Sequence, residues 1–171
     1  EKKYYFIQGK SIALVTNQTG IDKAGIPNYQ RFMAMDDVDL KIIFTPEHGL
    51  FGEAADGEKV VYDSIGIKLP TVVSLYRNIR KPTLDMLAGV NTIVYDIQDI
   101  GTRFYTYIST LGLVMEAAGE LNIPVLVLDR PNPIRGDIIE GPILDMEFRS
   151  FVGYYPISIR YGKTIGELAD L

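Results

Sequence analysis

Five short apolar runs divide this chain, and each of them stops at a cluster of polar residues. The runs span residues 11–16, 38–44, 71–75, 92–95 and 124–128. They are apolar along their whole length instead of alternating, which is typical of parallel strands covered on both faces. Because helical patterns stand between several of the runs, the sequence predicts an α/β fold with a parallel sheet of about five strands and right-handed crossovers.

The segments between the runs carry the helical signals. Residues 27–35 and 82–88 each have a proline near the start of a helical pattern. A longer helix is predicted from apolar residues at intervals of 4, 3, 4 and 3, which form one stripe. These are Phe104, Ile108, Leu111, Met115 and Ala118. Near the end of the chain, Thr164 and Glu167 have the spacing of a capping box, which predicts that a helix begins there.

The second apolar run leads into Pro46-Glu47-His48-Gly49, which holds the only histidine of the chain. Ligands of parallel α/β sheets bind beyond the carboxyl ends of the strands, so this turn is a candidate site. Glu47 can act as a general acid or base if burial raises its pKa. The alternative is a loop carboxylate that caps the following backbone. His48 is either a catalytic group or a structural hydrogen-bonding group.

Two aspartates, Asp96 and Asp99, follow the fourth run. With Glu47 they are candidates for the carboxylate pair of a glycosidase, or for a divalent-metal site. The alternative is that Asp99 caps the long helix and Asp96 pairs with Arg103. The remaining candidates have amide, guanidinium or phenol groups that suit an anionic or polyhydroxyl ligand. They are Asn17, Gln18, Arg103, Tyr105, Arg130 and Asn132.

Composition narrows the classes of ligand. A net charge of -5 argues against nucleic acid and anionic membranes as partners, and no apolar run approaches the ~20 residues of a membrane span. There is no cysteine, so thiolate metal sites and disulfides are excluded. With a single histidine, a zinc site would need several carboxylate ligands, which is uncommon. The glycine motifs of dinucleotide and nucleotide sites are missing, as is the serine-hydrolase elbow. We therefore expect no metal and no cofactor.

Residues 45–69 form the one long connection without a helical pattern. Loops of this length inside a compact domain are usually functional or disordered. We consider two interpretations, a lid over the site and a surface excursion with a small hairpin through residues 60–62.

Six ordered segments together resemble a bacterial family of exo-acting β-N-acetylmuramidases, formerly a domain of unknown function. They are LVTNQTGID, KIIFTPEHGLFGEAADGE, VYDIQDIGTRFYTY, VLDRPNP, EGPILDMEFRSFVGYYP and GKTIGELA. The resemblance spans residues 9–171. It implies a glycoside hydrolase that releases terminal N-acetylmuramic acid from peptidoglycan fragments. It also implies a Rossmann-like N-terminal domain and a smaller C-terminal domain, with the site in the cleft between them.

The resemblance also implies roles for single residues. Glu47 matches the catalytic glutamate of the family and would protonate the leaving oxygen, while Asp99 or Asp96 would act as base, nucleophile or charge stabiliser. The acetamido group of the sugar is a further candidate for that second role. Arg103 or Arg130 would pair with the lactyl carboxylate. The other motif positions are His48 and Asn132.

Two short segments depart from the family pattern. Arg160-Tyr161-Gly162-Lys163-Thr164 stands where Arg-His-Gly-Met-Thr is usual, and Ile134-Arg135-Gly136 stands where Leu-Gly-Gly is usual.

We thus expect residues 1–135 to form the Rossmann-like domain with the catalytic motifs. Residues 136–171 would be a connecting segment and the beginning of a truncated C-terminal domain, which completes the cleft in the whole protein. The expected partner is a peptidoglycan-derived saccharide, and the expected location is periplasmic or secreted instead of cytoplasmic. Two other hypotheses remain open, a non-catalytic domain that binds cell-wall sugar and a metal-dependent hydrolase that uses Glu47, Asp96 and Asp99.

Overall fold

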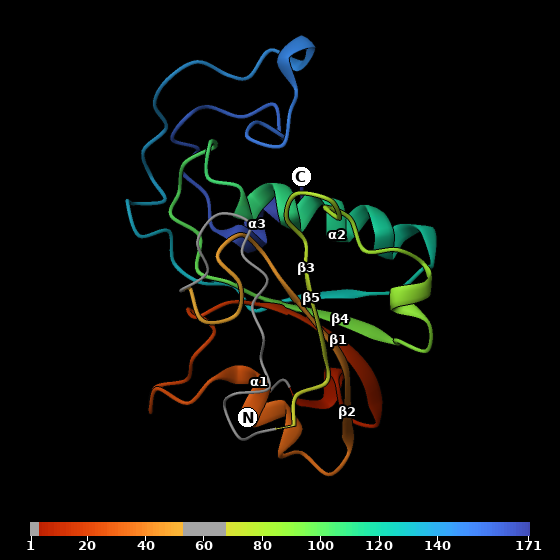
Figure 1. Ribbon diagram of the computed structural model, residues 1–171. Coiled ribbons are helices and arrows are strands. Elements are labelled where there is room, and N and C mark those ends of the chain that lie inside the picture. The colour runs from red at the N-terminus through yellow and green to blue at the C-terminus, as the bar shows by residue number, and fades with distance from the viewer. Residues whose placement is uncertain (1–3, 53–67) are drawn as a thin grey trace.

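A computed structural model describes residues 4–52 and 68–171. Over these residues, five parallel strands form one sheet in the order β3-β2-β1-β4-β5 (Figure 1). The strands are β1 (Lys10–Thr16), β2 (Val38–Thr45), β3 (Thr71–Ser74), β4 (Thr92–Asp96) and β5 (Val125–Val127). The predicted α/β class and its parallel sheet are confirmed. The strand order, in which β1 lies at the centre, is that of a Rossmann-like fold.

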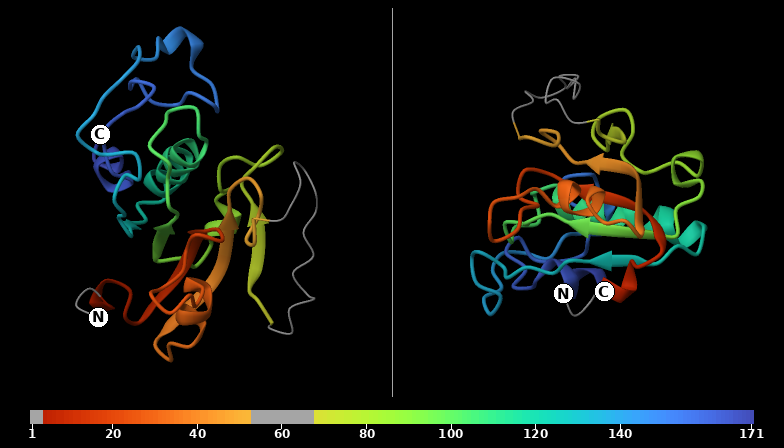
Figure 2. Two further views of the ribbon diagram at one scale, coloured as in Figure 1. Left: turned by 90° about the vertical axis from the view of Figure 1, so that its left-hand side faces the viewer. Right: turned by 90° about the horizontal axis from the view of Figure 1, so that it is seen from below.

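In the part of the chain that the structure describes, three α-helices cover the sheet. The long helix α2 (Tyr107–Glu120) and the short helix α3 (Ile165–Ala169) lie on one face, and α1 (Asn28–Met33) lies on the other (Figures 1 and 2). The predicted capping box at the start of α3 is present, since the Thr164 hydroxyl accepts from Glu167 N and the Glu167 carboxylate accepts from Thr164 N. None of the helices in the described ranges is long and apolar enough to cross a membrane.

Each face of the sheet has its own apolar core. Ala13 and Val15 of β1 pack with Ile108 and Leu111 of α2, whereas the intervening β1 residues belong to the cluster that contains Tyr29 of α1. Side chains of a strand alternate between its faces, and here both faces are buried. This burial on both sides is why the strands are apolar along their length in the sequence.

Two of the predicted helices differ in the structure. The segment 82–88 contains only the 3-10 turn η3 (Asp85–Leu87), because a segment this short forms too few hydrogen bonds to offset helix nucleation. The long helix begins at Tyr107, not near Phe104. The backbone before it forms a turn, in which Tyr105 N donates to Thr102 O over 3.1 Å, and it is tied to the excursion because Arg103 N donates to Ile159 O over 2.7 Å. Phe104 is therefore a loop residue, 56% exposed.

Between β5 and α3 the chain leaves the sheet and forms an excursion above α2 (Figure 2). Its regular elements are the 3-10 turn η4 (Met146–Phe148) and isolated bridges such as Glu140–Arg160. The 3-10 turn η1 (Tyr4–Phe6) precedes β1. A domain boundary at residue 135 stays a prediction. The lid and the hairpin through residues 60–62 lie outside the described residues.

Candidate active site

The turn after β2 presents Glu47 at the carboxyl edge of the sheet. His48 and Gly49 both have positive φ, 68° and 69°, and Gly49 N donates to Pro46 O over 3.3 Å. A positive φ at a residue other than glycine is unfavourable and is often found at functional sites. The side chain of Glu47 is 24% exposed, and its Oε1 lies 3.9 Å from His48 Nε2.

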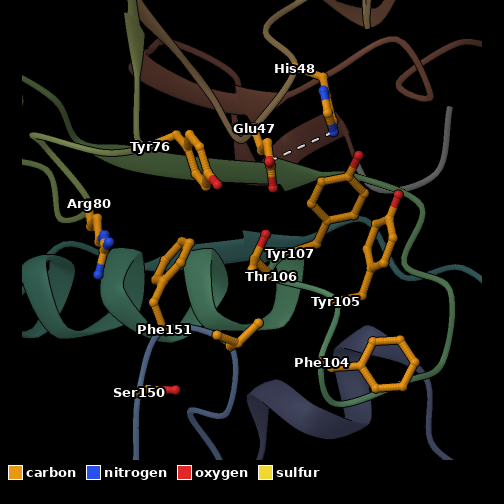
Figure 3. A pocket seen from close by; sticks show the side chains of 11 residues that line it. Glu47, His48, Tyr76, Arg80, Phe104, Tyr105, Thr106, Tyr107, Ser150 and Phe151 are labelled. Atoms are coloured by element: carbon orange, nitrogen blue, oxygen red, sulfur yellow. Dashed lines mark ion pairs between the residues drawn. The ribbon is translucent and has the colours of Figure 1, made fainter. Parts of the chain in front are cut away.

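Glu47 and His48 line a cavity of about 560 Å³ (Figure 3). Its walls come from four segments that are distant in the sequence. The turn after β2 provides the two residues just named, and the segment after β3 provides Tyr76 and Arg80. The loop before α2 provides residues 104–106, and α2 itself provides its first residue, Tyr107. The excursion provides residues 150–152. The cavity thus lies beyond the carboxyl ends of the strands, as predicted for parallel sheets.

Aromatic rings form much of this cavity. Tyr105 and Tyr107 contact each other edge to face, with ring centroids 4.9 Å apart and an interplanar angle of 86°. Tyr76 and Phe151 form a second pair at 6.1 Å. Rings with an apolar face and a polar edge can contact both the C–H face and the hydroxyl groups of a sugar. The cavity therefore suits an amphipathic ring.

Tyr107 supplies a hydroxyl that stays protonated. Burial, the neighbouring Tyr105 and, to a smaller extent, the charge of Glu47 raise the pKa of Tyr107 to about 12. Glu47 and Tyr107 line the same cavity. Figure 3 shows Glu47 and the ring of Tyr107 on the same side of the cavity. A neutral phenol beside a carboxylate can donate to it or to a bound ligand.

Asp96 does not line this cavity. It is 4% exposed, and its Oδ1 accepts from Arg130 Nε over 2.9 Å and from Arg130 Nη2 over 2.7 Å. Its Oδ2 accepts from Asn28 Nδ2 over 2.9 Å. The predicted pairing of Asp96 with Arg103 is therefore wrong, because Arg130 is the partner. This network lies between the ends of β1 and β4, where the strand order reverses and Rossmann-like folds usually bind ligands.

Asp99 also lies outside the cavity lining, in a buried site. Its Oδ2 accepts from Gly101 N over 2.7 Å and from the hydroxyl of Tyr161. Its Oδ1 has no hydrogen-bond partner among the described residues. Burial raises the pKa of Asp99 to about 6, although the N–H groups of Gly101 and Ile100 act in the opposite direction. The predicted cap of α2 is wrong, since the N-cap residue is Thr106.

Three further predicted residues make contacts within the chain. Arg103 Nη1 donates to the carbonyl oxygens of Pro142 and Ile157, and Asn132 Nδ2 donates to Lys163 O. Both therefore connect the strand-end loops to the last forty residues. Asn17 Oδ1 accepts from Thr19 N and from the Thr19 hydroxyl, which is turn chemistry.

A second cavity of about 420 Å³ lies between the turn after β1 and the segment after β2. It is lined by Asn17 and Gln18 on one side, and by Leu50 and Phe51 on the other.

The structure thus brings Glu47, His48 and Tyr105 together from the predicted set. Sequence reasoning missed the wall residues Arg80 and Phe151. The polar residues that follow the third apolar run were a signal for the segment that carries Arg80. For Phe151 there was none, because it is far in sequence from every strand end. In the described part of the chain, Glu47, Asp96 and Asp99 do not form a cluster that could hold a metal ion.

The sequence and the fold of this chain are similar to those of known proteins. A peptidoglycan β-N-acetylmuramidase NamZ from Bacillus subtilis (strain 168) is 47% identical over 168 residues, which cover 96% of this chain and 40% of that protein. Two crystal structures of DUF1343 family proteins from Bacteroides fragilis superpose with TM-scores of 0.86 and 0.81, at 44% and 34% identity. Each match covers 98% of this chain and 42% of the other.

This chain therefore spans about two fifths of the length of these relatives. The family model described as exo-beta-N-acetylmuramidase NamZ, N-terminal, matches residues 12–171. The chain belongs to this family, as its N-terminal domain.

Proposed function

We propose that the protein is an exo-acting β-N-acetylmuramidase, a glycoside hydrolase that removes terminal N-acetylmuramic acid from peptidoglycan fragments. One observation carries the proposal: Glu47 projects from a turn with positive φ into an aromatic cavity of about 560 Å³. The name of the Bacillus subtilis relative supports the substrate class.

In this proposal Glu47 is the general acid. It protonates the glycosidic oxygen as the bond to C1 breaks, and Tyr107 lines the same cavity. Most retaining and inverting glycosidases use a second carboxylate, but in some families the acetamido group of the substrate takes its place. Among the described residues that line the cavity, Glu47 is the only carboxylate.

We therefore assign the second role to the substrate. The acetamido oxygen attacks C1 from the opposite face and forms a cyclic oxazolinium ion, which water then opens while Glu47, now deprotonated, takes up a proton. Asp96 and Asp99 would position the loop after β4 instead of reacting.

The test compares Glu47→Gln with wild type on a chromogenic β-glycoside of N-acetylmuramic acid. Loss of the acid should lower kcat by about 10²–10⁴-fold. Glu147→Gln is the matched control, because Glu147 is exposed on η4 and is not a cavity residue. Full activity of Glu47→Gln would refute the assignment.

The same preparation separates the two alternative functions. A non-catalytic sugar-binding domain would bind N-acetylmuramic acid without hydrolysis at any pH. A metal-dependent hydrolase would lose activity in EDTA, whereas the proposed mechanism predicts unchanged activity.

We further propose that the part of the protein corresponding to the remaining length of the relatives, where present, packs over the open side of the cavity. Phe104 and Val152 support this, since both line the cavity and are 56% exposed. Apolar side chains at the rim of a site are typical of surfaces that become buried. A peptidoglycan substrate also favours a periplasmic or secreted location in a bacterium.

A further inference from the structure

Arg80 is the one lysine or arginine that lines the cavity among the described residues. Its Cζ lies 4.7 Å from the ring centroid of Phe151. Stacking on an aromatic face holds a guanidinium in a fixed plane while its N–H groups stay available. Arg80 is an exposed residue, and its stacking on Phe151 favours orientations in which the guanidinium lies along the wall of the cavity.

The guanidinium of Arg80 has no acidic partner in the described part of the chain. Other arginines do have partners: Arg31 pairs with Asp22, Arg130 with Asp96 and Arg160 with Glu140. An unpaired guanidinium in a pocket is suited to a carboxylate, which it can bind in bidentate fashion. The chain carries a net charge of -5, so an anionic ligand needs a local cation to offset the repulsion.

Arg80 and Glu47 stand at different parts of the cavity. Figure 3 shows the rings of Tyr76 and Phe151 between them. In N-acetylmuramic acid the lactyl ether is on C3 and the glycosidic bond is on C1, so the two groups leave the ring in different directions. If the sugar rests on the aromatic rings with C1 toward Glu47, its lactyl carboxylate can reach a different wall of the cavity, where Arg80 stands.

We propose that Arg80 is the specificity-determining residue of the site. It binds the lactyl carboxylate of a terminal N-acetylmuramic acid, and it gives the protein its preference for this sugar over N-acetylglucosamine, which lacks that group. The inference rests on the proposed function. It replaces Arg103 and Arg130 in this role, because both are engaged in contacts within the chain.

The experiment measures kcat/KM for two chromogenic β-glycosides, of N-acetylmuramic acid and of N-acetylglucosamine. Arg80→Met should lower the value for the muramic acid substrate by about 10–100-fold, mainly through KM, since a hydrogen bond to a charged group is lost. The value for the glucosamine substrate should change by less than about threefold. Arg80→Lys should retain part of the preference. Arg31→Met, a paired arginine on α1, is the control and should match wild type.

A methyl ester of the lactyl group provides a second readout. With the ester, wild type should lose most of its preference for the muramic acid substrate over the glucosamine substrate. Arg80→Met should show little further loss of kcat/KM on the ester, because the charge pair is already broken. Equal losses on both sugars in Arg80→Met, or no loss on either, would overturn the proposal.

If wild type hydrolyses neither sugar, the proposed function fails but Arg80 can still be judged. Calorimetric binding of free N-acetylmuramic acid and N-acetylglucosamine then decides. Selective loss of muramic acid binding in Arg80→Met supports the role, and unchanged selectivity refutes it.

Discussion

Replacing Asp99 with asparagine should remove a specific pH dependence of stability. Asp99 is 5% exposed, and burial raises its pKa from 3.8 to about 6 in the folded state. The folded protein therefore holds this proton more tightly than the unfolded chain does. Stability from this group is highest below pH 4 and is lost as the pH rises through about 6, after which it stays constant.

The magnitude follows from the two pKa values. The difference between about 6 and 3.8 corresponds to roughly 3 kcal/mol in total, of which about 2 kcal/mol falls between pH 4 and pH 7. Asparagine has nearly the same shape, and its carbonyl oxygen can accept from Gly101 N and Tyr161 as Asp99 Oδ2 does. Its amide would replace the unpartnered Oδ1 and leave a donor unpaired, at a cost of about 1–3 kcal/mol at every pH.

The assay is urea denaturation of wild type and Asp99→Asn at pH 4 and pH 7. Relative to wild type, the variant should gain about 2 kcal/mol in unfolding free energy between the two pH values. Asp36→Asn, an exposed aspartate, is the control and should follow wild type. Parallel pH profiles for Asp99→Asn and wild type would show that the burial argument is wrong. Hydrolysis by the variant within a few-fold of wild type would agree with a positioning role for Asp99.

Three further predictions concern the ion pair between Asp96 and Arg130, the cap of α3 and the substrate. Arg130→Met leaves Asp96 buried without its ion-pair partner and should lower the free energy of unfolding by about 3 kcal/mol, measured by urea denaturation at pH 7; a loss below 1 kcal/mol would mean that Asn28 alone compensates the charge. Thr164→Ala removes the capping hydrogen bond of α3 and should cost about 1 kcal/mol in the same assay, whereas Thr164→Ser should cost little. A substrate with a trifluoroacetamido group should react much more slowly than the acetamido substrate, because its carbonyl oxygen is a weaker nucleophile; equal rates would argue for a protein nucleophile.

The sheet was predictable because burial on both faces imposes a pattern on each strand. Ile12, Ala13, Leu14 and Val15 are all fully buried, so β1 appears in the sequence as an unbroken apolar run. The turn after β2 was predictable for a related reason, since a parallel strand delivers its next residues to one edge of the sheet. The prediction of Glu47 as a candidate site residue followed from the strand pattern and from its position just after β2.

The distribution of roles among the polar residues could not be predicted in the same way. Asp96 is the last residue of β4 and Glu47 follows β2, yet Asp96 is held by an arginine from the loop after β5 and Glu47 lines the cavity. Whether a strand-end carboxylate is paired or lines a cavity depends on which loops pack against it. The spacing of residues in the sequence does not indicate that packing. Phe151 is the clearest case, because the excursion brings it to Tyr76 across 75 positions of sequence.

The ion pair between Asp96 and Arg130 has a consequence for how the family can diversify. A Rossmann-like sheet normally leaves its central crevice open for a ligand, and here the chain fills that crevice with its own charges. The residues of this central network are thus separate from those that line the cavity, which come from the segments after β2 and β3, the start of α2 and the excursion. Under the proposed function, mutations in the cavity wall would change the sugar that is accepted and would leave the ion pair between Asp96 and Arg130 in place.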